Sequence, residues 1–227
     1  MSSLTNILTQ RNIRAIVFDL DDTLYPEISY VKSGFCEVGK EIERRFGIAD
    51  ASDKLWQYFS VDKNDVYGRV LSDSGVRFDK SDIADLVEIY RTHNPKIELF
   101  DDTEKALISL RERGYKIGII TDGRVYQQHA KIEALGLSNL VDEIIVTDEL
   151  GGVESRKPNP LAFGIMCERL GVKPEDMVYV GDNPQKDFFI GSVGVLTVRI
   201  KRKGALNLGG EDYYKGIKED FLIGSLK

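Results

Sequence analysis

The fold is decided by residues 15–24, which read AIVFDLDDTL. The four residues from Ala15 to Phe18 form an unbroken apolar run that stops at Asp19. Such a run is typical of a parallel strand that is covered on both faces. Similar short runs recur along the chain, at residues 116–120, 144–147, 177–180, 195–198 and 221–223. We interpret each of them as a strand of one sheet.

Helical patterns separate these runs. Asp102 is expected to cap a helix that Gly114 closes. Two further helices are expected, at about residues 125–135 and 160–170. Strands and helices that alternate at these lengths predict an α/β domain with a doubly wound, mainly parallel sheet of the Rossmann type. In such sheets a ligand binds beyond the carboxyl ends of the strands.

Residues 26–98 break this alternation. Apolar side chains at Phe35, Val38, Ile42 and Phe46 repeat at spacings of three and four, which is the period of a helix face. We therefore expect a helical insert over 26–98, and an α/β core built from residues 1–25 and 99–227.

Composition excludes several classes of protein. The chain has 31 Lys and Arg against 37 Asp and Glu, so its net charge of −6 does not favour DNA, RNA or an anionic membrane as a partner. Its two cysteines, Cys36 and Cys167, are too far apart for a CxxC pair, which argues against a disulfide framework. No long apolar stretch precedes Asp19, so neither a signal peptide nor a membrane span is expected. These features predict a cytoplasmic protein.

Polar residues gather where the predicted strands end. The first strand is followed by Asp19 and Asp21, and a later one ends in Thr121-Asp122-Gly123. Lys157 precedes a predicted helix, and the strand at 177–180 leads to Asp182 and Asp187. Each of these turns alone is ordinary, because Asp and Asn often satisfy backbone N–H groups. Their placement on successive strand ends predicts one shared site.

The residue types at this site suit phosphoryl transfer. Crowded carboxylates repel one another and attract a hard cation with oxygen ligands, and Mg²⁺ is suited to a few carboxylates together with a phosphate. The Thr121 hydroxyl, the backbone N–H groups of Asp122 and Gly123, and the Lys157 ammonium supply donors for an anion. A carboxylate can also attack phosphorus covalently, which divides one difficult displacement into two easier ones.

Four motifs resemble those of the haloacid dehalogenase superfamily. They are DLDDTLY at 19–25, ITDG at 120–123, RKPNP at 156–160 and GDNPQKD at 181–187, in that family's order. The insert at 26–98 resembles the family's helical cap. The resemblance implies a HAD-like fold and an aspartyl-phosphate mechanism. In that mechanism Asp19 is the nucleophile and Asp21 the general acid and base.

The same resemblance implies roles for the remaining motif residues. Thr121 and Lys157 would hold the transferring phosphoryl group. Asp182 would bind Mg²⁺ together with the Asp19 carboxylate and the backbone carbonyl of Asp21. Asp187 would support these ligands from behind or complete the metal site. The second aspartate, Asp21, favours hydrolysis of a phosphate ester over carbon–halogen cleavage, since a departing halide needs no proton.

The expected substrate is a small phosphate ester, either a sugar phosphate or a nucleoside monophosphate. Two alternatives stay open. One is a phosphomutase, in which the phosphoryl group returns to a sugar; the other is a catalytically idle member that serves as a binding or regulatory module. The sequence leaves the oligomeric state open. Tyr25 is interpreted as a packing residue near the insert.

Overall fold

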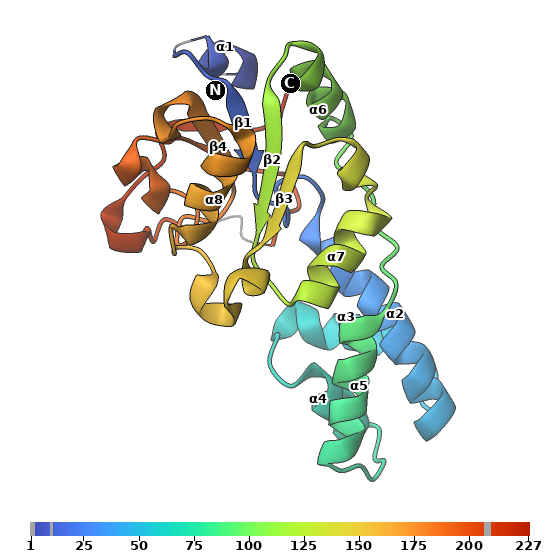
Figure 1. Ribbon diagram of the computed structural model, residues 1–227. Helices are drawn as coiled ribbons and strands as arrows, with labels where there is room; N and C mark the ends of the chain where they lie inside the picture. Colours follow the sequence, from blue (N-terminus) through green and yellow to red (C-terminus); the bar gives the residue numbers. More distant parts are fainter. Residues whose placement is uncertain (1–2, 10, 207–209) are drawn as a thin grey trace. The chain divides into compact units, whose positions relative to one another are not determined.

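The computed structural model describes residues 3–9, 11–206 and 210–227 (Figure 1). The strands are β1 (Ala15–Phe18), β2 (Lys116–Thr121), β3 (Glu143–Val146), β4 (Met177–Gly181), β5 (Leu196–Ile200) and β6 (Phe221–Ile223). Within these described ranges they form one sheet of six parallel strands in the order β3-β2-β1-β4-β5-β6. Every predicted apolar run is a strand, and the predicted α/β fold with a parallel sheet is confirmed.

Eight α-helices accompany the sheet in the described part of the chain. They are α1 (Leu4–Leu8), α2 (Glu27–Phe46), α3 (Ala51–Val61), α4 (Val66–Asp73), α5 (Lys80–Thr92), α6 (Thr103–Glu112), α7 (Val125–Ala134) and α8 (Leu161–Leu170). The helices α7 and α8 lie where the sequence predicts them. In Figure 1, α8 lies on one face of the sheet and α6 and α7 lie on the other.

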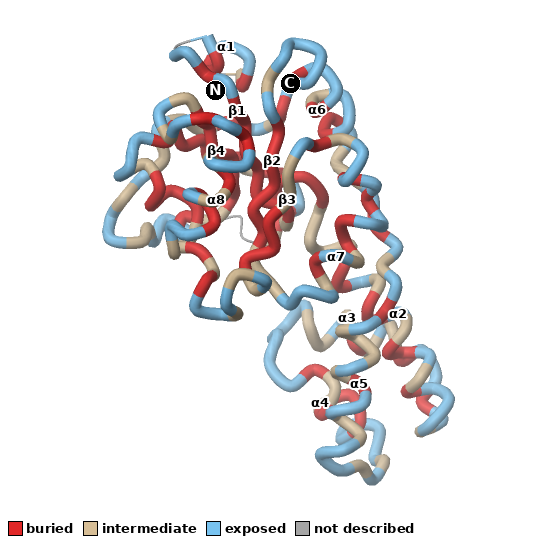
Figure 2. The backbone as a smooth tube through the Cα atoms, in the orientation of Figure 1, coloured by how far each residue is buried: buried red, intermediate tan, exposed pale blue. Residues whose placement is uncertain are grey.

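The strand order places β1 at the centre of the sheet. Ala15 is in register with Lys116 of β2 on one side and with Met177 of β4 on the other. Residues 15–18 are fully buried, as the red strands in Figure 2 show, because helices cover both faces. The carboxyl ends of β1, β2 and β4 therefore lie side by side at one edge of the sheet, which is the edge where ligands bind in this kind of fold.

The prediction that the Asp102 side chain caps α6 is wrong, although the residue lies at the predicted position. Asp102 occupies the N-cap position, but its side chain makes no hydrogen bond to the helix. Its carboxylate instead accepts hydrogen bonds from Nη1 of Arg202, at 2.8 and 2.9 Å, and from the backbone N–H of Leu226 at 2.8 Å. The side chain of Arg202 is 5% exposed, and a buried charge of this kind needs a carboxylate partner more than the helix needs a cap.

The chain divides into two compact units, and the smaller one spans Ser29–Ile97. Its bounds lie just inside the predicted insert of 26–98. It is helical, and the buried face of α2 includes Phe35, Val38 and Ile42 at the predicted spacing. A Cβ atom on Gly39 of α2 would lie 2.7 Å from the backbone nitrogen of Ser52, so glycine is required where α3 approaches α2.

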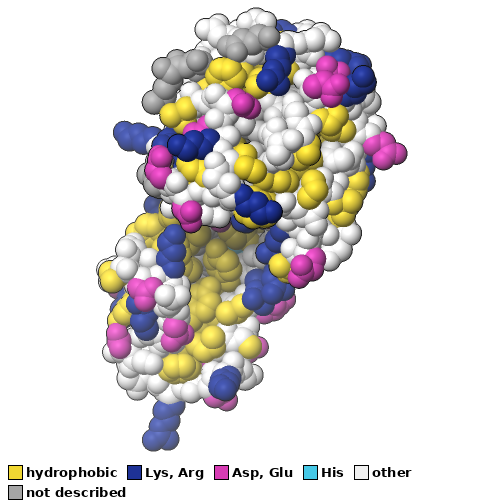
Figure 3. Space-filling view, turned by 90° about the vertical axis from the view of Figure 1, so that its left-hand side faces the viewer, with side chains coloured by type: hydrophobic (Ala, Val, Ile, Leu, Met, Phe, Trp, Pro, Cys, Tyr) yellow, Lys and Arg dark blue, Asp and Glu magenta, His cyan; other side chains and the backbone are white. Residues whose placement is uncertain are grey.

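The surface carries no concentration of one charge on the face that Figure 3 shows. Lys and Arg side chains alternate there with Asp and Glu side chains. Among the helices that the structure describes, none has the length and apolarity needed to cross a membrane.

Candidate active site

Three neighbouring strands deliver the central residues of the site. Asp19 follows β1, and its backbone N–H donates to the carbonyl of Val180 in β4 at 2.9 Å. Thr121 is the last residue of β2, and Asp182 follows β4 directly. The parallel register of these strands brings the three positions to the same edge of the sheet. The sequence prediction placed these residues at strand ends, and the structure has them there.

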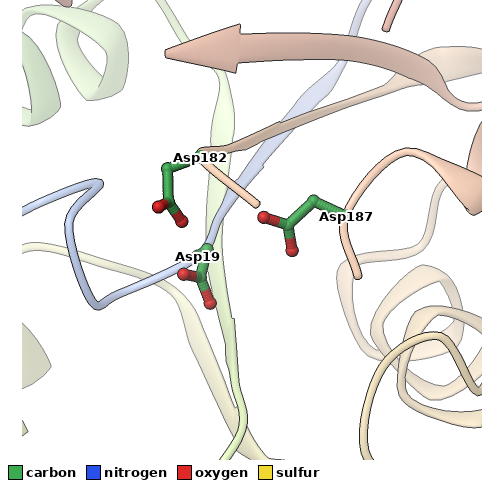
Figure 4. A group of neighbouring side chains, drawn as sticks. All are labelled: Asp19, Asp182 and Asp187. Carbon is green, nitrogen blue, oxygen red and sulfur yellow. The ribbon is translucent and has the colours of Figure 1, made fainter. Parts of the chain in front are cut away.

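Three carboxylates converge at this edge. Asp19, Asp182 and Asp187 each offer an oxygen, and these oxygens lie within 4.8 Å of one another. Figure 4 shows the three side chains pointing toward a common space from β1, from the end of β4 and from the loop that follows. All three residues are buried. Burial raises the pKa of Asp182 to about 9, and the neighbouring Asp187 and Asp19 carboxylates add to that effect.

Lys157 holds the nucleophile candidate in place. Its Nζ donates to Oδ1 of Asp19 at 2.6 Å, to Oδ1 of Asp187 at 2.8 Å and to the hydroxyl of Tyr179 at 2.7 Å. Burial alone would lower the pKa of Lys157, but the carboxylates of Asp187 and Asp19 raise it well above its usual range. The side chain therefore carries a positive charge in the middle of the carboxylates. Burial raises the pKa of Asp19 to about 7 in spite of this neighbour.

Both oxygens of Asp187 are occupied by hydrogen bonds. Oδ1 accepts from Lys157, and Oδ2 accepts from the backbone N–H of Asn183 at 2.8 Å. A Cβ atom on Gly181 would lie 2.4 Å from Oδ2 of Asp187, so the glycine leaves the room that this carboxylate occupies. In contrast, Oδ2 of Asp182 is buried and has no hydrogen-bond partner among the described residues. An unpaired buried carboxylate oxygen is costly, and a bound cation would satisfy the one on Asp182.

Asp122 supports the loop that carries the lysine. Its Oδ1 accepts hydrogen bonds from the backbone N–H of Lys157 and from the hydroxyl of Thr147, both at 3.0 Å. Its Oδ2 lies 3.2 Å from Nζ of Lys186. The carboxylate of Asp122 is thus engaged with the protein.

The side chain of Asp21 is held by a set of donors that the three carboxylates do not share. Nζ of Lys131 donates to Oδ1 at 2.7 Å, Nε2 of Gln128 donates to Oδ2 at 3.1 Å, and the hydroxyl of Tyr25 donates to Oδ1. Burial alone would raise the pKa of Asp21, but the Lys131 ammonium and these hydrogen bonds lower it overall. Nε2 of Gln128 also donates to Oγ1 of Thr121.

Most of the predicted site residues line one cavity of about 160 Å³. Its lining contains Asp19, Asp21, Glu27, Asp122, Lys157, Asp182, Asn183, Lys186 and Asp187. Thr121 and Gly123 do not line it, although Thr121 is joined to Asp21 through Gln128. Gly123 has a φ of 147°, and a Cβ atom there would lie 3.0 Å from the Gln128 side chain.

The sequence prediction missed four side chains of this site. They are Tyr25, Gln128, Lys131 and Tyr179, and Tyr25 had been interpreted as packing only. The pair Gln128 and Lys131 left no signal in the sequence, because only the structure shows that both are buried on one face of α7. A buried polar pair on a helix requires a polar partner. Tyr179 gave no sequence signal of a site residue, because a tyrosine in a buried strand is common.

Comparison with known proteins adds to this geometry. The sequence model of a haloacid dehalogenase-like hydrolase family matches residues 13–188. The glyceraldehyde 3-phosphate phosphatase of Methanocaldococcus jannaschii is 30% identical over 95% of this chain and 94% of its own length. The pyrophosphatase PpaX of Halalkalibacterium halodurans is 26% identical, covering 94% of both chains. The crystal structure of a HAD phosphatase from Thermococcus onnurineus matches with a TM-score of 0.60 and 29% identity over 94% of each chain.

Proposed function

Because the chain belongs to the haloacid dehalogenase-like hydrolases, we propose that it is a magnesium-dependent phosphatase of small phosphate monoesters that works through an aspartyl-phosphate on Asp19. The observation that carries this proposal is the buried cluster of Asp19, Asp182 and Lys157 at the carboxyl edge of the sheet. It combines a carboxylate, a place for a cation and a fixed positive charge at one cavity. This combination is suited to a phosphoryl group and its anionic surroundings.

The donor set fits Mg²⁺. All the candidate ligands are hard oxygens, and the unpartnered Oδ2 of Asp182 is a position that a cation would satisfy. We propose that Asp182, the carboxylate of Asp19 and the backbone carbonyl of Asp21 hold the ion. When bound, Mg²⁺ supplies positive charge that weakens the repulsion between the nucleophile and the phosphate. Asp187 uses both oxygens within the protein, so its proposed role is to support Lys157.

The chemistry proceeds in two displacements. A carboxylate oxygen of Asp19 forms a bond to phosphorus while the bond from phosphorus to the leaving oxygen breaks. Burial alone would raise the pKa of Asp21, but Lys131 lowers it overall. Asp21 therefore first takes up a proton from solvent and then gives it to the leaving oxygen as the alcohol departs. Asp21 then takes a proton from a water molecule, whose oxygen attacks phosphorus and releases Asp19. The Thr121 hydroxyl, the backbone N–H groups of Asp122 and Gly123 and the Lys157 ammonium bind the phosphate oxygens during both displacements.

The substrate class is a small phosphorylated compound. The named activities of the two relatives suggest glyceraldehyde 3-phosphate and inorganic pyrophosphate as the first compounds to compare. A sugar phosphate and a nucleoside monophosphate complete the comparison. We propose the monoester class, since the relative of higher identity is named for a monoester and covers nearly the whole chain.

The experiment that tests this function is release of inorganic phosphate from these four compounds. We expect turnover of a monoester in Mg²⁺, loss of turnover after chelation, and recovery when Mg²⁺ is returned. Ca²⁺ is expected to support little turnover, because its larger and looser coordination disturbs the in-line geometry. Full activity in a chelator-treated sample would contradict the metal assignment. Appearance of an isomerised sugar phosphate without phosphate release would indicate a mutase.

A further inference from the structure

Helix α7 presents two buried polar side chains to the Asp21 carboxylate. Gln128 is 2% exposed and Lys131 is 6% exposed, and they lie three positions apart on one helix face. Each reaches a different oxygen of Asp21, with Lys131 on Oδ1 at 2.7 Å and Gln128 on Oδ2 at 3.1 Å. Two donors on two different oxygens fix both the position and the plane of a carboxylate.

Gln128 also joins Asp21 to Thr121. Its Nε2 donates to Oδ2 of Asp21 and to Oγ1 of Thr121, which uses both N–H bonds of one amide nitrogen. The Thr121 hydroxyl keeps its own hydrogen for a phosphate oxygen. The side chain of Gln128 therefore sets the spacing between a residue proposed to hold the phosphate and the residue proposed to protonate its leaving group.

The fold itself does not require buried polar side chains at positions 128 and 131. A lysine buried on a helix costs free energy unless it is paired, and Lys131 is paired with the Asp21 carboxylate. Only replacement of both partners by apolar residues would keep the packing without that cost. Donors placed on a helix also hold a partner more exactly in place than donors on a loop do. These considerations favour a functional reason for the polar set as a whole, Asp21 included, since stability alone is served better by apolar residues at all three positions.

We propose that Gln128 and Lys131 are positioning residues, which hold the side chain of Asp21 in the orientation from which it transfers its proton. This inference rests on the proposed role of Asp21 as the proton donor. Neither residue touches the phosphate in this account. Lys131 reaches the reaction through Asp21, and Gln128 reaches it through Asp21 and Thr121, so their removal should reproduce part of the effect of removing Asp21.

The readout is the dependence of the first displacement on the leaving group. An alkyl alkoxide leaves poorly without a proton, whereas 4-nitrophenolate leaves readily without one. In single-turnover experiments with Mg²⁺, Lys131→Met and Gln128→Met should each slow phosphorylation of the protein by an alkyl phosphate by about 10- to 100-fold. With 4-nitrophenyl phosphate Lys131→Met should stay within about threefold of the wild type. Gln128→Met also removes the hydrogen bond to Thr121, so it should slow the aryl phosphate more than Lys131→Met does, but still less than it slows the alkyl phosphate. Glu133→Met, an exposed change on the same helix, is the control and should alter neither rate.

A double-mutant cycle separates positioning from general damage. In an Asp21→Asn background the proton is already lost, so Lys131→Met should cause no further loss with the alkyl phosphate. Equal slowing for both leaving groups, or a full additional loss in the Asp21→Asn background, would overturn the proposal. Gln128→Met removes no charge, and it keeps the test available if Lys131→Met fails to fold. A wild type that never becomes phosphorylated would refute the proposed function itself, which is a different outcome.

Discussion

Nζ of Lys157 lies 2.6 Å from Oδ1 of Asp19, although 138 positions separate the two residues in the chain. The contact forms because the loop before α8 and the end of β1 meet at the same edge of the sheet. It places a permanent positive charge against the proposed nucleophile. The ammonium holds the carboxylate in one orientation and remains close to the oxygens of an incoming phosphate.

The first prediction concerns the nucleophile. Asp19→Asn keeps the shape of the side chain but removes the charge that attacks phosphorus and helps to hold the cation. Turnover should fall by at least ~10³, because covalent chemistry and metal binding are lost together. Steady-state phosphate release measures this, with the exposed substitution Asp101→Asn as the control. Retention of a tenth of wild-type turnover would rule out the aspartyl-phosphate mechanism.

The second prediction concerns Asp122, whose Oδ1 accepts from the backbone of Lys157 and from Thr147. An asparagine offers a carbonyl oxygen at the same place, so Asp122→Asn should keep kcat within about threefold of the wild type. Asp122→Ala leaves both donors unpaired, loosens the Lys157 loop and should lower kcat by about 10- to 100-fold. If Asp122→Asn lost as much activity as Asp122→Ala, the negative charge itself would be required, and the hydrogen-bonding role would be wrong.

The third prediction concerns the dependence of stability on pH. Burial raises the pKa of Asp19 to about 7 and that of Asp182 to about 9, from an ordinary value of 3.8. A carboxyl whose pKa is raised by folding binds its proton more tightly in the folded state. The metal-free protein should therefore lose stability as the pH rises from about 4 towards 7 for Asp19 and towards 9 for Asp182.

Magnesium should oppose this loss, because it binds the deprotonated carboxylates. The rise in the thermal midpoint on adding Mg²⁺ should be larger at about pH 8.5 than at about pH 5. Asp182→Asn is the matched variant, and it should reduce the Mg²⁺ effect at the higher pH. Equal midpoint shifts at both pH values would show that these carboxyls do not compete with protons for the cation.

The sequence predicted the strands because each is a short apolar run that ends abruptly in a polar residue. The positions of Asp19 and Asp182 were predictable for the same reason, since a parallel sheet brings strand ends together whatever lies between them. Lys157 follows no strand, and it was predicted from its place before a helix and from its motif. The partners of Asp21 were not predictable in this way. In the sequence Lys131 looks like an ordinary surface lysine of a helix. Only the structure shows that the face of α7 that carries it is turned toward Asp21.

The role of Asp102 was misread for a related reason. An aspartate before a helix is a good cap by local rules, and those rules see only neighbouring residues. Arg202 lies 100 positions away in the sequence and is buried beside it. Tertiary packing decides whether Asp102 bonds to the helix or to Arg202, and the residues next to Asp102 in the sequence carry no information about that packing.

In the proposed mechanism Asp19 becomes phosphorylated and Asp21 moves the protons. The variant Asp21→Asn tests both parts at once, because 4-nitrophenolate leaves without a proton while the following attack of water still needs a base. The measurement mixes this variant with ³²P-labelled 4-nitrophenyl phosphate and Mg²⁺, quenches in acid, and maps the labelled peptide. We expect label to accumulate on the peptide that contains Asp19, and an alkyl phosphate to label it about 10²- to 10⁴-fold more slowly. Absence of protein-bound label, or label on a peptide without Asp19, would contradict the aspartyl-phosphate mechanism.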